Sequence, residues 1–135
     1  MFMLVCLVVF VISFLSYSRY FIKTELEARI LDQTSSCYAG QPSATGGAWH
    51  NGNIVMTSAF ETPDPCHWVS SIEAYQQGDR LEVKIKTSHQ GFCVQCFGFR
   101  EVDYEIVSPE AEKSMDIYVE VEGITQQKAL LSLPV

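Results

Sequence analysis

Cysteines are the residues best suited to do chemistry in this chain. Four of the five follow the first 36 residues, and they are Cys37, Cys66, Cys93 and Cys96. An even set of cysteines behind an apolar leader is typical of a disulfide framework in an exported protein. A direct bond between Cys93 and Cys96 would close a tight, geometrically awkward ring. We therefore expect Cys93 and Cys96 each to pair with one of the other two, in an order that the sequence leaves open.

The same sulfur atoms could instead hold a metal ion. Cys93 and Cys96 have the spacing of a zinc knuckle, and Cys66 could add a third thiolate. Three histidines could complete such a site: His50, His67 and His89. A single C-x-x-C pair is weak evidence for zinc, and a thioredoxin-like redox site needs a βαβ context that is absent here. Disulfides are therefore preferred, and a metal-binding or redox domain built on Cys66, Cys93 and Cys96 is the alternative.

The carboxylates do not suggest an active site. Acid–base catalysis needs two carboxylates in one cleft, or a nucleophile beside its base. Seven of the 16 acidic residues alternate with apolar residues, as on a solvated sheet face: Glu82, Glu101, Asp103, Glu105, Asp116, Glu120 and Glu122. The sequence contains no phosphate-binding loop, dinucleotide fingerprint or nucleophile elbow. We expect neither an enzyme, nor a cofactor, nor a bound metal.

The charge balance narrows the range of partners. The chain has 9 basic and 16 acidic residues among its 135, for a net charge of −7. Such an acidic domain repels phosphate backbones, which argues against nucleic-acid binding.

An apolar segment opens the chain and predicts a membrane anchor. Residues 1–17 carry no charge, and apolar residues continue beyond them at helical spacing. We expect one N-terminal transmembrane helix with an amphipathic extension over residues 1–33, and contact with lipid through residues 1–22. A signal peptide cleaved near Ser18, giving a secreted domain, is the alternative. Basic residues after the segment favour a cytoplasmic domain, whereas the cysteines favour an extracytoplasmic one, and we follow the cysteines.

The rest of the chain predicts an all-β domain. Residues 34–47 are rich in Ser, Thr and Gly and indicate a linker. Residues 48–135 switch to a period of two, starting with the hairpin signal Asn51-Gly52. Strands are expected over residues 53–61, 67–75, 80–88, 102–106 and 115–122, with an edge strand at 128–133. About seven short strands indicate an antiparallel, immunoglobulin-like sandwich.

The alternation also predicts which side chains face inward. Nine apolar or aromatic residues on three of the strands form the expected core: Leu81, Val83, Ile85, Val102, Tyr104, Ile106, Ile117, Val119 and Val121. The opposite faces of the same strands should be wet.

Short motifs carry a partial resemblance to a known group of proteins. Residues 60–67 read FETPDPCH, residues 81–83 read LEV, residues 93–96 read CVQC, and Tyr104 follows. These elements resemble a group of exported prokaryotic, notably archaeal, proteins with a Pro-Cys after the first long strand and a C-x-Q-C-like pair before an aromatic strand. The resemblance covers about residues 53–107. It implies an exported β-sandwich and no particular activity.

A long apolar N-terminal helix before a small β domain is also similar to type IV pilins and archaeal filament subunits. The sequence departs from them, because no basic-Gly processing site precedes the apolar run and no acidic residue lies near position 5. We predict a membrane-anchored, extracytoplasmic β-sandwich with a binding or structural role at the cell surface or in a membrane complex. A pilin-like filament subunit, self-associating through its helix, is the alternative. The protein partner is not specified by the sequence.

Overall fold

The computed structural model describes residues 1–108, 110–122 and 127–134, with side chains for all of these except 16–21 and 127–131. These residues form one N-terminal helix, α1 (Phe2–Phe21), and nine strands. The strands are β1 (Thr24–Leu26), β2 (Ala28–Cys37), β3 (Ala44–His50), β4 (Asn53–Thr62), β5 (His67–Gln77), β6 (Arg80–His89), β7 (Gly98–Ile106), β8 (Met115–Glu122) and β9 (Gln127–Leu133).

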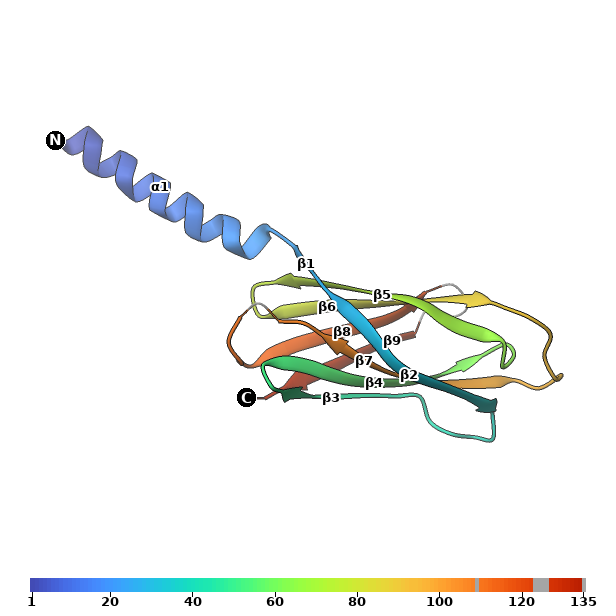
Figure 1. The fold of residues 1–135 in the computed structure, drawn as a ribbon. Coiled ribbons are helices and arrows are strands. Elements are labelled where there is room, and N and C mark those ends of the chain that lie inside the picture. Colours follow the sequence, from blue (N-terminus) through green and yellow to red (C-terminus); the bar gives the residue numbers. More distant parts are fainter. Residues whose placement is uncertain (109, 123–126, 135) are drawn as a thin grey trace.

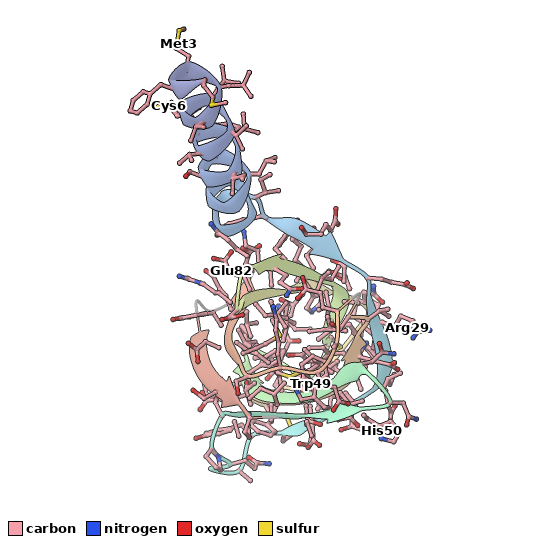
Figure 2. The ribbon with its side chains drawn as sticks, turned by 90° about the vertical axis from the view of Figure 1, so that its left-hand side faces the viewer. Met3, Cys6, Arg29, Trp49, His50 and Glu82 are labelled. Carbon is pink, nitrogen blue, oxygen red and sulfur yellow. A yellow bond between two sulfur atoms is a disulfide. The ribbon has the colours of Figure 1, made fainter. Side chains whose placement is uncertain are left out.

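Helix α1 projects away from the β domain (Figure 1). All side chains of residues 1–15 are exposed, and Figure 2 shows Met3 and Cys6 far from the strands. No helix within the described residues is both long enough and apolar enough to cross a membrane. The structure thus confirms one N-terminal helix, but this helix does not meet the requirements of the expected transmembrane span.

The helix predicted over residues 1–33 ends at Phe21 instead. The chain continues as β1, which pairs with β5, and as β2, which pairs with β7. Leu26, Ala28 and Ile30 recur at every second position, but Leu26 and Ile30 are also four apart and so match a helical spacing equally well. Residues 24–37 form strands and not a helix because they pair with β5 and β7, and tertiary contacts of this kind routinely override local propensity.

The linker predicted over residues 34–47 is also mostly strand. Strand β2 runs through Cys37 and β3 begins at Ala44, which leaves residues 38–43 as the connection. Strands β2 and β3 are the two edge strands of their sheet, so their side chains are largely exposed. An edge strand needs few apolar residues. The Ser/Thr/Gly composition of these residues therefore resembled that of a linker, and neither strand was predicted.

Two sheets pack face to face around one core (Figure 1). One has the strand order β1-β5-β6-β8-β9 and the other β2-β7-β4-β3. The two-sheet β fold is confirmed, with nine strands in the described residues rather than about seven. It is not purely antiparallel, because β6 and β8 run parallel. Strand β7 lies in the opposite sheet, so the chain crosses over and returns to lay β8 beside β6 in the same direction.

The predicted core is confirmed, since all nine residues expected to face inward are buried. Strand β4 adds Ile54, Met56 and Phe60 to the same cluster. Trp68 breaks the alternation of β5 and is 39% exposed. The register between β5 and β6 shifts between Val69 and Ser71, and a bulge of this kind turns the preceding side chains to the other face.

Tight turns close two hairpins at the end of the sandwich that α1 enters (Figure 1). Asn51 and Gly52 have φ angles of 51° and 80°, the left-handed pair that a two-residue β3–β4 turn requires. Gly78, with φ 60°, closes the β5–β6 hairpin. The first of these turns was predicted from Asn51-Gly52.

Candidate functional site

Three loops of the described residues lie at the end of the sandwich opposite α1 (Figure 1). They are residues 38–43, 63–66 and 90–97. Cys37 is bonded to Cys96, and Cys66 to Cys93, with Cα atoms 5.7 and 5.8 Å apart. All four predicted cysteines therefore pair, and the connectivity that the sequence left open is 37–96 and 66–93. Both bonds tie the loop 90–97, which we call the tethered loop, to the rest of the domain.

The turn that carries Cys66 is built around the side chain of Asp64. The Cys66 backbone N–H donates to Asp64 Oδ1 at 2.9 Å, which makes an Asx turn. The Thr62 hydroxyl donates to the Asp64 carbonyl oxygen at 2.7 Å. A Cβ atom on Gly98 would collide with the Thr62 hydroxyl and the Asp64 carbonyl. Close approach of β7 to this turn therefore requires glycine at position 98.

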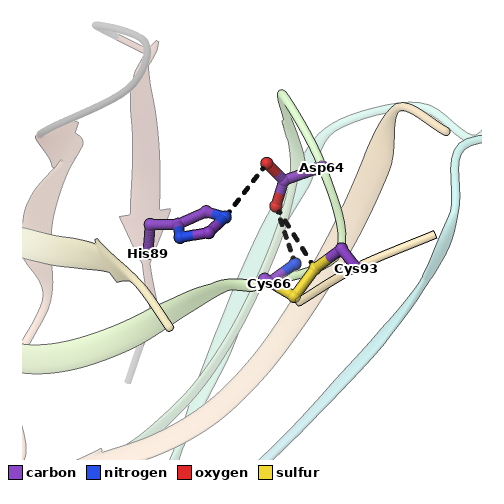
Figure 3. A group of neighbouring side chains, drawn as sticks. All are labelled: Asp64, Cys66, His89 and Cys93. Atoms are coloured by element: carbon purple, nitrogen blue, oxygen red, sulfur yellow. Dashed lines mark hydrogen bonds and ion pairs between the residues drawn. A yellow bond between two sulfur atoms is a disulfide. The ribbon is translucent and has the colours of Figure 1, made fainter. Parts of the chain in front are cut away.

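Two histidines converge on the Asp64 carboxylate, and Figure 3 shows the contact made by His89. His67 and His89 are register partners across β5 and β6, and their ring centroids are 5.1 Å apart. His67 Nδ1 lies 3.1 Å from Asp64 Oδ1, and His89 Nε2 lies 3.4 Å from Oδ2. Burial acts to raise the pKa of the Asp64 carboxyl. The Cys66 N–H and the two imidazoles outweigh that effect and hold the pKa below its ordinary value.

A buried arginine holds the chain on both sides of Cys66. Arg100 is 1% exposed, and its Nε and Nη2 donate to the carbonyls of His67 and Pro65 at 3.1 and 3.0 Å. Its guanidinium lies 4.3 Å from the centroid of the Trp68 ring. Burial lowers the pKa of Arg100. Among the described residues its Nη1 has no hydrogen-bond partner, so desolvation is only partly offset.

The tethered loop exposes apolar side chains instead of burying them. Phe92, Val94 and Phe97 are 107%, 68% and 74% exposed. The loop also borders a cleft of about 630 Å³, lined by Pro63, Asp64, His89 and residues 91–97. Aromatic side chains on a rigidly held loop, beside a cleft with polar groups, are typical of a surface that binds a partner.

The predicted metal-ligand candidates lie at both ends of the sandwich, most of them at the far end and His50 at the end that α1 enters. Cys66, Cys93 and His89 lie together at the far end, whereas Cys96 is bonded to Cys37. His50 is exposed and lies next to the β3–β4 turn, at the end that α1 enters. Three of the alternative ligands therefore meet, and the C-x-x-C pair is divided between two disulfides.

Sequence reasoning missed Asp64 and Arg100 as site residues. Asp64 stands two residues before Cys66 between two prolines, which is a recognisable Asx-turn signal. Arg100 precedes Val102, Tyr104 and Ile106 by two-residue steps and so shares their inward face. Its charge concealed that position, because arginine is seldom fully buried.

The predicted acidic face lies outward, where several of its carboxylates form surface ion pairs. Glu82 contacts Lys23 at 2.9 Å, and Glu105 contacts Arg29 at 3.3 Å. These pairs lie on exposed strand faces and not in the cleft, so they contribute little to binding or stability.

Comparison with known proteins does not assign a function to the candidate site. No family model, no curated protein and no solved structure matches the chain. The candidate site therefore rests on the contacts within the chain itself.

Proposed function

We propose that this protein is a membrane-anchored, extracytoplasmic β-sandwich that presents its tethered loop to a protein partner at the cell surface or in a membrane complex. The observation that carries the proposal is the opposite placement of two exposed apolar features. Helix α1 leaves one end of the sandwich, and the tethered loop lies at the other (Figure 1). In this loop Phe92, Val94 and Phe97 are exposed. An immunoglobulin-like arrangement of the two sheets is part of the same proposal.

The composition and exposure of α1 support anchoring in lipid. Its large apolar side chains from Phe2 to Leu15 are exposed. Water is an unfavourable solvent for so much apolar surface, so the helix gains free energy wherever lipid covers it. Arg19 and Lys23 follow the apolar run, as expected for residues at the headgroup level.

The two disulfides support an extracytoplasmic location. Bonds of this kind persist in oxidising compartments and are rare in a reducing cytosol. They close loops of 59 and 27 residues in sequence separation within a small domain. The basic residues after α1 favour the opposite orientation, and we give the disulfides more weight because both of them tie the tethered loop to the rest of the domain.

The tethered loop supports a protein partner. Exposed aromatic residues on a preorganised surface are the usual anchors of a protein interface, since little conformational entropy is lost when they bind. Nucleic acid is disfavoured by the net charge of −7.

A filament subunit is the second candidate, and the same exposure of α1 favours it. Helices that are apolar on all sides can cover one another in a bundle instead of inserting into lipid. In that case, the purified protein would assemble into regular filaments without any lipid.

Flotation of the full chain with neutral phosphatidylcholine vesicles tests the anchoring. We expect the wild-type chain to float with the vesicles and the triple variant Val5→Glu/Val8→Glu/Ile12→Glu to remain in the dense fraction. A matched variant, Thr34→Glu/Ser35→Glu/Ser36→Glu, places the same charges on exposed positions of β2 and should still float. Wild-type protein that stays in the dense fraction would refute the proposal, and regular filaments in electron micrographs of that fraction would support the second candidate.

A further inference from the structure

The donor atoms around the Cys66–Cys93 bond have the composition of a metal site. Figure 3 shows Asp64, Cys66, His89 and Cys93 gathered at the far end of the sandwich. One carboxylate oxygen, one imidazole nitrogen and two sulfur atoms all lie within 4.8 Å of one another. Two sulfurs, one nitrogen and one oxygen are a set that zinc accepts in tetrahedral geometry.

We propose that reduction of the Cys66–Cys93 disulfide converts these four residues into a site for a thiophilic divalent cation of the zinc type. The inference goes beyond the proposed anchoring and binding role and does not depend on it. The same four residues then have two states, a covalent one in the oxidised protein and a metal-bound one in the reduced protein.

The redox step balances with a dithiol as the reductant. The dithiol supplies two electrons and two protons, the S–S bond breaks, Cys66 and Cys93 become thiols, and the reductant leaves as its own disulfide. The cation then displaces the two thiol protons, which pass to solvent, because thiolates and not thiols bind metals. In the oxidised state both sulfurs are neutral and bonded to each other, so the site is closed to metal.

Three of the four ligands are held in place without the disulfide. Asp64 is fixed by the Cys66 N–H and by the Thr62 hydroxyl. Cys66 accepts a hydrogen bond on its carbonyl from the Gln90 N–H at 3.0 Å, beside the β5–β6 ladder that positions His89. Reduction therefore leaves this part of the site preorganised, which lowers the free-energy cost of binding a cation.

The fourth ligand, Cys93, is confined by the two ends of the tethered loop. His89 precedes the loop in the β5–β6 ladder, and the Tyr38 N–H donates to the Phe97 carbonyl at 2.7 Å where the loop joins β7. Cys93 Sγ also lies 3.6 Å from Asp64 Oδ1. The loop is short, so both ends keep the Cys93 sulfur near the other donors.

A cation can reach the site from solvent. The cleft of about 630 Å³ is lined by Asp64, His89 and Cys93. The His89 side chain is 51% exposed, so it can turn its ring toward a cation without disturbing the core.

The test is titration of the full chain, in detergent micelles and in a Cys6→Ser background, with Zn²⁺ and with Co²⁺ as a spectroscopic substitute. A phosphine reductant, which does not compete as a thiol, opens the disulfides. We expect no binding by the oxidised protein and one ion per chain after reduction. The Co²⁺ form should show thiolate-to-cobalt charge-transfer absorption, and Zn²⁺ binding should release protons to the buffer.

Matched variants locate the ligands. Cys93→Ser removes one of the two thiolates and should weaken both the binding and the charge-transfer band, whereas Cys37→Ser, which removes a half-cystine of the other disulfide, should retain one-to-one binding. His89→Asn should lose one-to-one binding, and His50→Asn, at the opposite end of the domain, should keep it. These histidine substitutions are at exposed positions and leave the core intact. Reduced protein that binds no Zn²⁺, or His89→Asn protein that binds it as tightly as the wild type, would overturn the proposal.

Discussion

The two ends of the sandwich are held together by different means. At the end that α1 enters, two tight turns with left-handed residues join neighbouring strands. At the opposite end, three longer loops are joined by two disulfides and by the guanidinium of Arg100. The two tight turns depend on residues that are adjacent in the chain, whereas the disulfides of the far end join residues 27 and 59 positions apart.

The tight turns near α1 support the pairing of the strands, whereas the disulfides and Arg100 support the loops of the candidate site. Local turns fix strand register with little long-range information. Long-range bonds hold loops that cannot bury enough apolar surface to order themselves. We therefore expect substitutions at the far end to cost more than matched substitutions at the end near α1.

Loss of a disulfide should have the largest effect. In the loop-entropy description, replacing Cys37 and Cys96 by Ala should lower the free energy of unfolding by about 4 kcal/mol. Replacing Cys66 and Cys93 should cost about 3.5 kcal/mol, because that bond closes the shorter loop. At the end near α1, Lys113→Ala removes surface ion pairs with Asp79 and Glu110 and a long hydrogen bond to the Gly78 carbonyl, and it should cost less than about 1 kcal/mol. Denaturant unfolding measures the loss of unfolding free energy in all three variants. Equal losses would contradict the expectation that the far end contributes more to stability than the end near α1.

The buried arginine should have the next largest effect. Arg100→Ala removes two hydrogen bonds to backbone carbonyls and leaves a cavity, so we expect a loss of about 3 kcal/mol. Arg80→Ala is the matched control, since the Arg80 guanidinium also lies over an aromatic ring, 4.0 Å from the Tyr118 centroid, but is exposed. That variant should cost less than about 1 kcal/mol. A similar loss of thermal stability in both variants would show that Arg100 does not support the site.

Two glycines allow the same comparison on the backbone. Gly98→Ala drives a Cβ into the Asp64 carbonyl and should cost about 2–3 kcal/mol, since the backbone of the turn must shift. Gly52→Ala meets open space and only has to adopt a left-handed φ, at about 1 kcal/mol. Chemical denaturation of the two variants gives the difference directly. A larger cost at Gly52 would reverse the ranking.

The Asp64 carboxylate should give the smallest and most specific signal. Its pKa is lowered on folding, so the ionised group favours the folded state above the ordinary Asp pKa of about 3.9, and this contribution disappears as the pH falls through the folded-state pKa. The difference in unfolding free energy between wild type and Asp64→Asn should therefore shrink as the pH is lowered below about 4. Unfolding curves across that range measure it, and a difference that stays constant with pH would exclude the interaction.

The contrast between local turns and long-range bonds also explains which features could be predicted from the sequence. Alternation placed Val83, Tyr104 and Val119 in the core, and Asn51-Gly52 marked its turn, because both signals are local. The pairing of His67 with His89 could have been counted outward from the β5–β6 turn, but the bulge after Val69 shifts that register. Which cysteine meets which is set only when both sheets pack, so no local pattern could supply it.

The edge strands show a second limit. Strands β1 and β2 cover residues predicted as helix and linker, because an edge strand with one wet face has a weak apolar signature. They are defined by pairing with β5 and β7, by Leu26 in the core and by the Gln33 side chain, which bonds to the Val69 backbone. A truncated chain that lacks α1 should therefore begin before Thr24, because a start at Cys37 would remove β1 and nearly all of β2.

Quenching by brominated acyl chains tests most directly whether the two ends of the molecule face different surroundings. A tryptophan is placed either in α1 by Phe10→Trp or at the tethered loop by Phe92→Trp, and the emission of the wild-type protein is subtracted. We expect a blue-shifted, strongly quenched emission for Phe10→Trp in vesicles and no quenching for Phe92→Trp. Equal quenching at both positions, or none at Phe10→Trp, would contradict a molecule with α1 in lipid and the tethered loop away from it.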